Sequence, residues 1–384
     1  MKKFRLFYLI LSLLILLPLT SCDLSMILED SSRTNTGQKE INNEKENETK
    51  EDKPKEQETK EDKPNENEEV IDIEYDMNLY VKDYKDNYGY KALANDLEHG
   101  TFMQDAYKNF YESSLNVLNS KENIELDSSK TETETVNFVN IYQTPWFEDS
   151  SLIDYYKSAW SVFVAENPIF YFLSNGSLTR TQKSTTTETK NGEIVSQKEE
   201  IEYSFILVAY DNFSKFSERD AINKKIVKMF DSTKDINLKE NNYDKVFEIN
   251  NYLKNNLVYA YKKDGVTPED SYWAHNIIGL LNYNKGVCEC YTKCFKLLSD
   301  YYGLNTLSVY GKTVKKQEAH AWNYVNLGDN WYGMDVTWND SNVADQYFLC
   351  SKFKMAEDHV PYGSTYGITY QPVVPTLSDE AYTN

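Results

Sequence analysis

The sequence predicts an α+β fold, in which a helix that begins at Cys288 packs on an antiparallel sheet and a mostly helical domain with a β-hairpin precedes both. Three observations lead to this prediction. Apolar residues recur at three- and four-residue intervals after Cys288, and Gly303 follows them at the position where helices favour glycine. Strand-forming residues fill 320–327 and 331–337 on both sides of a turn sequence. Residues 179–210 alternate around an Asn-Gly turn.

Changes in composition and periodicity divide the chain into five predicted segments. These are a lipoprotein signal peptide (1–22), a disordered charged linker (23–70), an N-terminal helical domain with a hairpin (71–215), a second domain that contains Cys288 (216–360) and a C-terminal tail (361–384). Aromatic residues make up 14% of the chain, which is ample for a packed core. The net charge of −20 argues against nucleic acid as a partner and against direct adhesion to anionic lipid.

The first 22 residues have the pattern of an export signal. A basic start is followed by the apolar run Phe7–Leu17 and then by Leu19-Thr20-Ser21-Cys22. This tetrapeptide resembles the lipobox of bacterial lipoproteins, in which the cysteine is lipidated and becomes the mature N-terminus. We therefore expect an exported protein, held by lipid on Cys22 at the outer face of the bacterial cell membrane. An ordinary secretory signal or an uncleaved anchor is the alternative.

The segment 23–70 has no apolar periodicity. Its charged sequence Glu48–Pro54 recurs nearly unchanged as Glu58–Pro64. Such a composition cannot bury enough apolar surface to offset the entropy lost on ordering the chain. We expect a disordered linker that holds the folded part away from the membrane.

Helices are predicted on both sides of the hairpin. Apolar periodicity places them within 102–118, 152–163, 216–230 and 246–257. The domain 71–215 offers no catalytic set of residues, so we expect it to bind substrate or cell wall or to act as a packing scaffold. Residues 347–349 are predicted to form a closing strand. His359 and the tail after it are expected to be surface cover.

Three residues have the chemistry of a nucleophilic site: Cys288, His320 and Asp335. Cysteine reacts as the thiolate, and a helix N-terminus favours that charged form. Histidine takes or shares the proton, and a carboxylate fixes the tautomer and orientation of the imidazole. If 320–327 and 331–337 pair as a hairpin, His320 and Asp335 are cross-strand neighbours to within about one residue.

The motifs around these residues resemble those of the transglutaminase-like superfamily. They are Gly286-Val287-Cys288 before a helix, His320-Ala321-Trp322-Asn323 on one strand and Met334-Asp335-Val336-Thr337-Trp338 on the next. The similarity covers roughly residues 240–350. It implies a papain-like Cys-His-Asp site on a C-terminal transglutaminase-like domain of a bacterial lipoprotein. The sequence departs from the family pattern at Cys290, where glycine is frequent.

Other interpretations of these residues stay open. Cys290 or Cys294 could be the reactive thiol, or the three cysteines could bind zinc, although their spacing on a helix is not a standard zinc spacing. Trp273 and Trp322 are candidate substrate-pocket residues, with packing around the site as the alternative. His275 lies in the loop before Cys288, and we expect an ordinary loop histidine there rather than a second base or a substrate contact.

We expect an acyl-transfer enzyme that acts on amide or peptide bonds of proteins or wall peptides. It would be a cysteine protease or amidase, or a protein-glutamine transglutaminase, with protein or peptide as its partner. No metal and no other cofactor is expected. The rival hypotheses are a catalytically idle transglutaminase-like binding module tethered to the membrane and, more weakly, a substrate-binding lipoprotein of a transporter.

Overall fold

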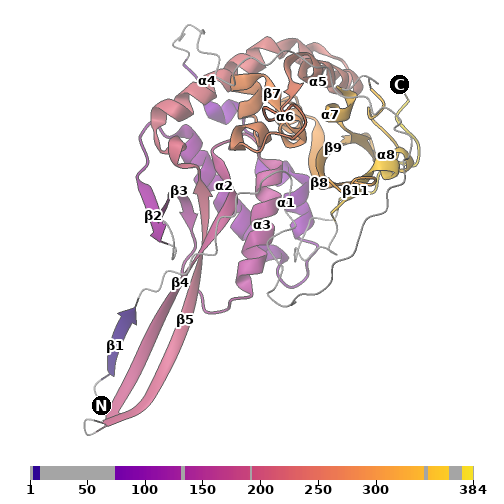
Figure 1. Ribbon diagram of the computed structural model, residues 1–384. Coiled ribbons are helices and arrows are strands. Elements are labelled where there is room, and N and C mark those ends of the chain that lie inside the picture. Colours follow the sequence, from indigo (N-terminus) through magenta and orange to yellow (C-terminus); the bar gives the residue numbers. More distant parts are fainter. Residues whose placement is uncertain are drawn as a thin grey trace, which may run out of the picture.

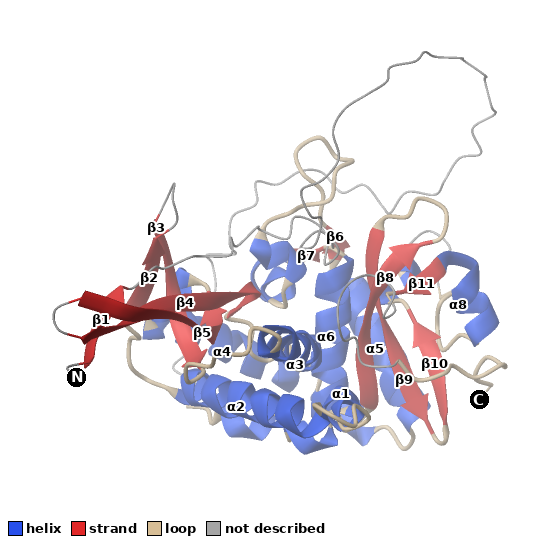
Figure 2. Cartoon of the chain, turned by 90° about the horizontal axis from the view of Figure 1, so that it is seen from below, coloured by secondary structure: helices blue, strands red, loops and turns tan. Residues whose placement is uncertain are grey.

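The computed structural model describes residues 3–8, 74–130, 135–190, 193–340, 345–362 and 374–383 of the 384-residue chain. Two antiparallel sheets lie on opposite sides of a layer of helices, as Figure 1 and Figure 2 show from two directions. This arrangement confirms the predicted α+β class. The predicted linker and Cys22 lie outside the described residues. Among the helices of the described part, none has the length and apolarity needed to cross a bilayer.

The first sheet has the strand order β1-β4-β5-β3-β2. Its strands are β1 (Lys3–Tyr8), β2 (Leu126–Lys130), β3 (Thr135–Gln143), β4 (Leu173–Lys190) and β5 (Glu193–Ala209). The β4–β5 pair is the predicted hairpin, and in Figure 1 it projects well beyond the helices. β1 pairs with the far part of β4, where Lys3 lies opposite Glu188. β2 and β3 were not predicted. β2 reads Leu-Asp-Ser-Ser-Lys and lacks alternating apolar residues, whereas β3 is rich in strand-forming residues and was overlooked. The N-terminal part is therefore richer in strand than expected.

The helical layer matches the predicted periodicity closely. Its helices are α1 (Tyr88–Leu93), α2 (Gly100–Asn119), α3 (Leu152–Glu166), α4 (Phe216–Ser232), α5 (Asn242–Asn256), α6 (Cys288–Tyr301), α7 (Val336–Asn339) and α8 (Lys352–Asp358). Short 3-10 or π turns occupy Met77–Tyr80, Tyr84–Asp86, Asp211–Ser214, Lys234–Leu238, Tyr272–His275 and Gly279–Tyr283. Helix α6 begins at Cys288, as predicted. Gly303 follows its end with φ of +75°, a left-handed conformation that favours glycine.

The second sheet carries the remaining long strands in the order β10-β9-β8-β11. They are β8 (Asn305–Thr313), β9 (Ala319–Leu327), β10 (Asn330–Met334) and β11 (His359–Pro361), and a separate parallel pair joins β6 (Val258–Tyr259) to β7 (Lys285–Gly286). Two predictions were wrong here. The strand predicted to run to 337 ends at Met334, and residues 347–349 form no strand, because the sheet is closed by β11 instead.

Helix α6 lies in the middle of the largest apolar core, which draws residues from Met77 to Leu349. Its side chains are buried on nearly every face, as expected for a helix covered on all sides. Even Lys296 is fully buried, and its ammonium group lies 2.6 Å from the carboxylate of Asp300. Lys82, from the N-terminal part, lies 3.2 Å from the same carboxylate. The N-terminal part thus contacts the helix that positions Cys288.

Candidate active site

Cys288 is the first residue of α6 and its side chain is buried, with 3% of the residue exposed. The residue before it, Val287, is extended and donates its N–H to the carbonyl of Ala274 at 2.9 Å. The chain therefore enters the helix from a fixed direction. The first-turn N–H groups of a helix have no intrahelical acceptor, and the helix dipole favours negative charge at this end. The local environment suits an anionic sulfur.

His320 lies on β9 between Cys288 and Asp335. Its Nε2 is 2.7 Å from Oδ2 of Asp335, and its side chain also hydrogen-bonds Cys288. Because Nε2 is occupied, the bond to the thiol falls to Nδ1. Burial alone would lower the pKa of His320, but the charge and hydrogen bond of Asp335, assisted by Cys288, raise it to about 10. The imidazole is therefore held in its charged form.

The backbone places Asp335 beside His320 in a different way from the one predicted. It follows the end of β10 and caps the short helix α7, with Oδ1 accepting the N–H of Trp338 at 3.1 Å. In the hairpin register Met334 lies opposite Asn323, so His320 and Asp335 are not direct cross-strand neighbours. Burial favours the neutral acid, but His320 and His359 outweigh it and hold the pKa of Asp335 well below its usual range.

His359 is the residue that sequence reasoning missed. It was expected on the surface, but only 3% of it is exposed, and its Nε2 lies 3.0 Å from the same Oδ2 atom of Asp335. Strand β11 places it there by pairing with β8, with His359 opposite Thr313. The chain has 4 histidines, and the pairing of β11 with β8 brings two of them to one carboxylate, which no local sequence pattern predicts.

Indole rings cover the imidazole of His320. Trp338 stacks on it at 5.0 Å between ring centroids, and Trp322 lies at 5.9 Å. Trp322 is 1% exposed, so it packs behind the site. Trp273, the other predicted pocket residue, stacks on Tyr283 at 4.2 Å. A role for either Trp273 or Trp322 in binding substrate stays a prediction.

The other cysteines have core environments. Cys290, Cys294 and Cys350 are free thiols and buried, like Cys288, so the four cysteines of the described part form no disulfide. The sulfurs of Cys290 and Cys294 lie 3.9 Å apart, and burial raises the pKa of Cys294 well above its usual value. Burial also raises the pKa of Cys350 to about 11. Of the four, Cys288 is the thiol that hydrogen-bonds His320.

One group among the described residues has the ligand chemistry of a metal site: His320, Asp335 and His359. Its two nitrogen–oxygen distances are 2.7 and 3.0 Å. A tetrahedral zinc ion with bonds of roughly 2.0–2.1 Å holds its ligand atoms about 3.3 Å apart. The three side chains are therefore placed for hydrogen bonds to one another, and direct ligation of one ion would require them to separate.

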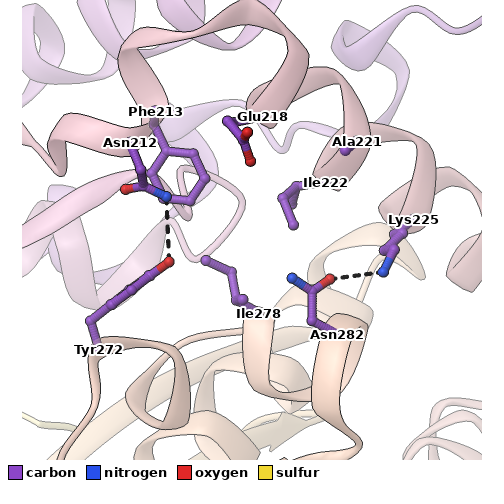
Figure 3. A pocket seen from close by; sticks show the side chains of 9 residues that line it. All are labelled: Asn212, Phe213, Glu218, Ala221, Ile222, Lys225, Tyr272, Ile278 and Asn282. Atoms are coloured by element: carbon purple, nitrogen blue, oxygen red, sulfur yellow. Dashed lines mark hydrogen bonds between the residues drawn. The ribbon is translucent and has the colours of Figure 1, made fainter. Parts of the chain in front are cut away.

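A small cavity lies between α4 and the loop at Tyr272 (Figure 3). Its volume is about 130 Å³, and its lining includes Glu218, Lys225 and Asn282 but none of Cys288, His320 and Asp335. Pockets for small ligands usually measure roughly 300–1,000 Å³. None of the three thiol-site residues lines the cavity, and its volume is below the range of pockets that bind drug-sized ligands.

A family model matches the part of the chain that carries this site. Residues 231–336 match the family model described as the transglutaminase-like superfamily. These residues form a transglutaminase-like domain. The match ends just after Asp335, so it includes all three residues of the site but leaves out His359.

Two solved structures are similar at low identity. One is described as a crystal structure of a TGase, with 18% identity, a TM-score of 0.28 and coverage of 49% of this chain and 50% of that one. The other is a candidate cysteine protease from Cytophaga hutchinsonii, with 15% identity, a TM-score of 0.24 and coverage of 44% of this chain and 68% of that one. This chain thus spans about half of the TGase. No curated protein matches the sequence.

The raised pKa of His320 predicts a pH-dependent stability. Because the pKa is about 10 in the folded protein and ordinarily 6.5, protonation favours the folded state. This contribution is complete below the unfolded pKa of about 6.5 and is lost as pH rises through about 10. We expect His320→Gln to lower the free energy of unfolding more near pH 6.5 than near pH 10, as measured by urea denaturation.

The comparison is made in wild type and again in a Cys288→Ala background, because Cys288 itself contributes to the raised pKa of His320 and its removal should leave only the larger part that Asp335 causes. Asp335 adds no slope of its own, since its pKa is held well below this range. His99→Gln serves as the matched control, because that histidine is only half-buried and lies outside the site. A loss of stability at His320→Gln that stays constant across the range would contradict the assignment.

Proposed function

We propose that this protein is an acyl-transfer enzyme in which Cys288 attacks amide or peptide carbonyl groups. The observation that supports this most directly is the buried chain of contacts from the Cys288 thiol to His320 and on to Asp335. A thiol at a helix N-terminus, an imidazole on one side of it and a carboxylate behind the imidazole are the parts that thiol acyl transfer requires. Transglutaminases and cysteine proteases of the superfamily share this chemistry.

In the first step, the Cys288 sulfur forms a bond to the carbonyl carbon of the substrate. Negative charge develops on the carbonyl oxygen, next to the first-turn N–H groups of α6. When the intermediate collapses, the carbon–nitrogen bond breaks and the amine leaves with a proton from Nδ1 of His320. A thioester on Cys288 remains. Asp335 holds the imidazole by Nε2 throughout, so Nδ1 stays directed at the sulfur.

In the second step, water or a primary amine attacks the thioester carbon. His320, now neutral, accepts the proton of the attacking group, and the sulfur leaves as the thiolate. Attack by water gives hydrolysis or deamidation, whereas attack by an amine gives a cross-link. The same three residues serve both outcomes. We favour hydrolysis or amide modification of a surface protein or wall peptide, because the lipobox-like sequence at Cys22 implies that the enzyme faces such substrates.

The decisive measurement follows three products at once. Purified protein is incubated with a glutamine-containing protein and a fluorescent primary amine, and label uptake, free ammonia and new peptide fragments are recorded together. We expect Cys288→Ala to abolish whichever signal wild type produces, because the thioester cannot form. Asp335→Asn should reduce it by roughly 10²- to 10⁴-fold, because the imidazole loses its orienting carboxylate.

Cys350→Ala is the matched control, since it removes a buried free thiol that donates to the carbonyl of Gln346. It should retain activity. Label uptake lost with Cys288 indicates a transglutaminase, fragments indicate a protease and ammonia alone indicates a deamidase. If all three channels are silent and Cys288 alkylates no faster than Cys350, the acyl-transfer proposal is wrong and the idle binding module is favoured.

His359 should contribute to the same activity as a positioning residue. It supplies one of two hydrogen bonds to Oδ2 of Asp335, and a hydrogen bond to a charged group is worth about 1.5–3 kcal/mol. We expect His359→Ala to lower kcat by roughly 10- to 100-fold with little change in KM. His359→Gln, which can place an amide N–H near the lost Nε2, should recover part of kcat. Wild-type kcat in His359→Ala would show that the second histidine is idle.

We also propose that the protein is lipid-anchored at Cys22 on the outer face of a bacterial cell membrane. Cleavage before Cys22 would remove β1 and leave the far edge of β4 without that partner. The test is mass spectrometry of the N-terminal peptide of protein purified from bacterial membranes. A diacylglycerol-modified Cys22 is expected, and the modification should disappear in Cys22→Ala. An unmodified, uncleaved N-terminus in wild type would rule the anchor out.

A further inference from the structure

A second buried polar group lies at the first turns of α6, beside the residue that follows Cys288. His275 is 2% exposed, and its Nδ1 lies 3.0 Å from Oε2 of Glu289, the residue that follows Cys288. Lys293 holds the other carboxylate oxygen of Glu289 at 2.8 Å and donates to the carbonyl of His275 at 3.1 Å. Both the ring and the backbone of His275 are therefore fixed to the first turns of α6.

The charges of this group favour the protonated imidazole. Burial works against the charge on Glu289, but Lys293 and His275 outweigh it and lower its pKa to about 2. Burial likewise works against a charge on His275, but Glu289 and, to a smaller degree, Cys288 raise its pKa above the usual value. The backbone places this ring near Cys288, because Ala274, which precedes His275, accepts the N–H of Val287, which precedes Cys288. The prediction of an ordinary loop histidine does not describe this environment.

The second ring nitrogen of His275 has no partner. Nε2 is buried and makes no hydrogen bond among the described residues. A buried polar atom without a partner costs roughly 1–3 kcal/mol, and such atoms call for an explanation. Because Nδ1 donates to Glu289, the ring cannot turn to satisfy Nε2 without losing that bond. The protonated ring thus keeps one unused donor beside the first turn of the helix that carries Cys288.

We infer that His275 is a further catalytic residue, whose Nε2–H donates a hydrogen bond to the carbonyl oxygen of the substrate while Cys288 attacks it. The inference rests on the proposed acyl transfer and names the side chain that stabilises the negative charge developing on the carbonyl oxygen. No proton is transferred: the bond strengthens as the oxygen becomes anionic and weakens when the carbonyl reforms. The proton transfers belong to His320, because His320 hydrogen-bonds the thiol.

Glu289 and Lys293 are the supports of this donor. Glu289 accepts a hydrogen bond from Nδ1 and favours the protonated ring, in which Nε2 also carries a proton. Lys293 forms an ion pair that keeps Glu289 ionised, and it donates a hydrogen bond to the backbone carbonyl of His275. The resemblance to the superfamily drew attention to Cys288, His320 and Asp335, whereas His275 is identified by its burial and its unused nitrogen.

The test compares two reactions of Cys288 in the full chain. Acylation by p-nitrophenyl acetate passes through an anionic oxygen, whereas alkylation by iodoacetamide displaces iodide at a saturated carbon and needs no oxyanion stabilisation. We expect His275→Ala to slow acylation by roughly 10²- to 10³-fold, the usual effect of removing one oxyanion donor. Alkylation should stay within about threefold of wild type. His275→Gln, which offers an amide N–H near the position of Nε2, should recover part of the acylation rate.

Each outcome separates the inference from the proposed function. Rates are corrected with Cys288→Ala, which reports acylation of other groups. If wild type acylates no faster than Cys288→Ala, the acyl-transfer proposal itself fails. If wild type acylates and His275→Ala matches it, only the role of His275 is refuted. If acylation and alkylation fall together in His275→Ala and His275→Gln recovers neither, His275 merely supports the structure of the site, and the inference is overturned.

Discussion

The β8–β11 end of the fold is built around one buried carboxylate. Asp335 is 0% exposed, yet it is held in its charged form, and removing such a charge from water costs several kcal/mol. Two histidines and one backbone N–H compensate that cost, and each comes from a different element: β9, β11 and α7. The carboxylate therefore fixes more than the tautomer of His320. It ties together a central strand, the closing strand and a helix start, so the catalytic geometry and the packing of this end of the sheet depend on the same atoms.

The sulfur side of the site is arranged by the entry to α6. The hydrogen bond from the N–H of Val287 to the carbonyl of Ala274 sets the direction in which the chain enters the helix. His275 is the residue after Ala274. Gly286 matters for a steric reason, because a Cβ at that position would lie 2.4 Å from the sulfur of Cys290. Cys290, at the position where glycine is frequent in the superfamily, thus packs against the bare backbone of Gly286. The second thiol is a space-filling residue of the helix entry, and it leaves Cys288 as the thiol that meets His320.

Local patterns predicted much of this architecture. Apolar periodicity located α2, α3, α4, α5 and α6, and the Asn-Gly turn located the β4–β5 hairpin, because these elements are specified by residues close in sequence. The sequence also pointed to Cys288, His320 and Asp335. It failed where long-range contacts decide. β11 is three residues long and owes its existence to pairing with β8, so nothing in its own sequence marks His359 as buried. His275 was predicted to be an ordinary loop histidine because of its position before Cys288, whereas its hydrogen-bond partner Glu289 lies 14 residues further along the chain.

The position of His359 in the chain affects when the site becomes complete during synthesis. The thiol, the first imidazole and the carboxylate all precede residue 336, but the second imidazole donor to Asp335 follows only after α8, on β11 (His359–Pro361). A nascent chain emerges N-terminus first. Until β11 has emerged and docked on β8, Asp335 has one imidazole donor in place of two. Maturation of the active site is therefore coupled to completion of the sheet, and a chain that stops short of β11 carries a recognisable but unfinished site.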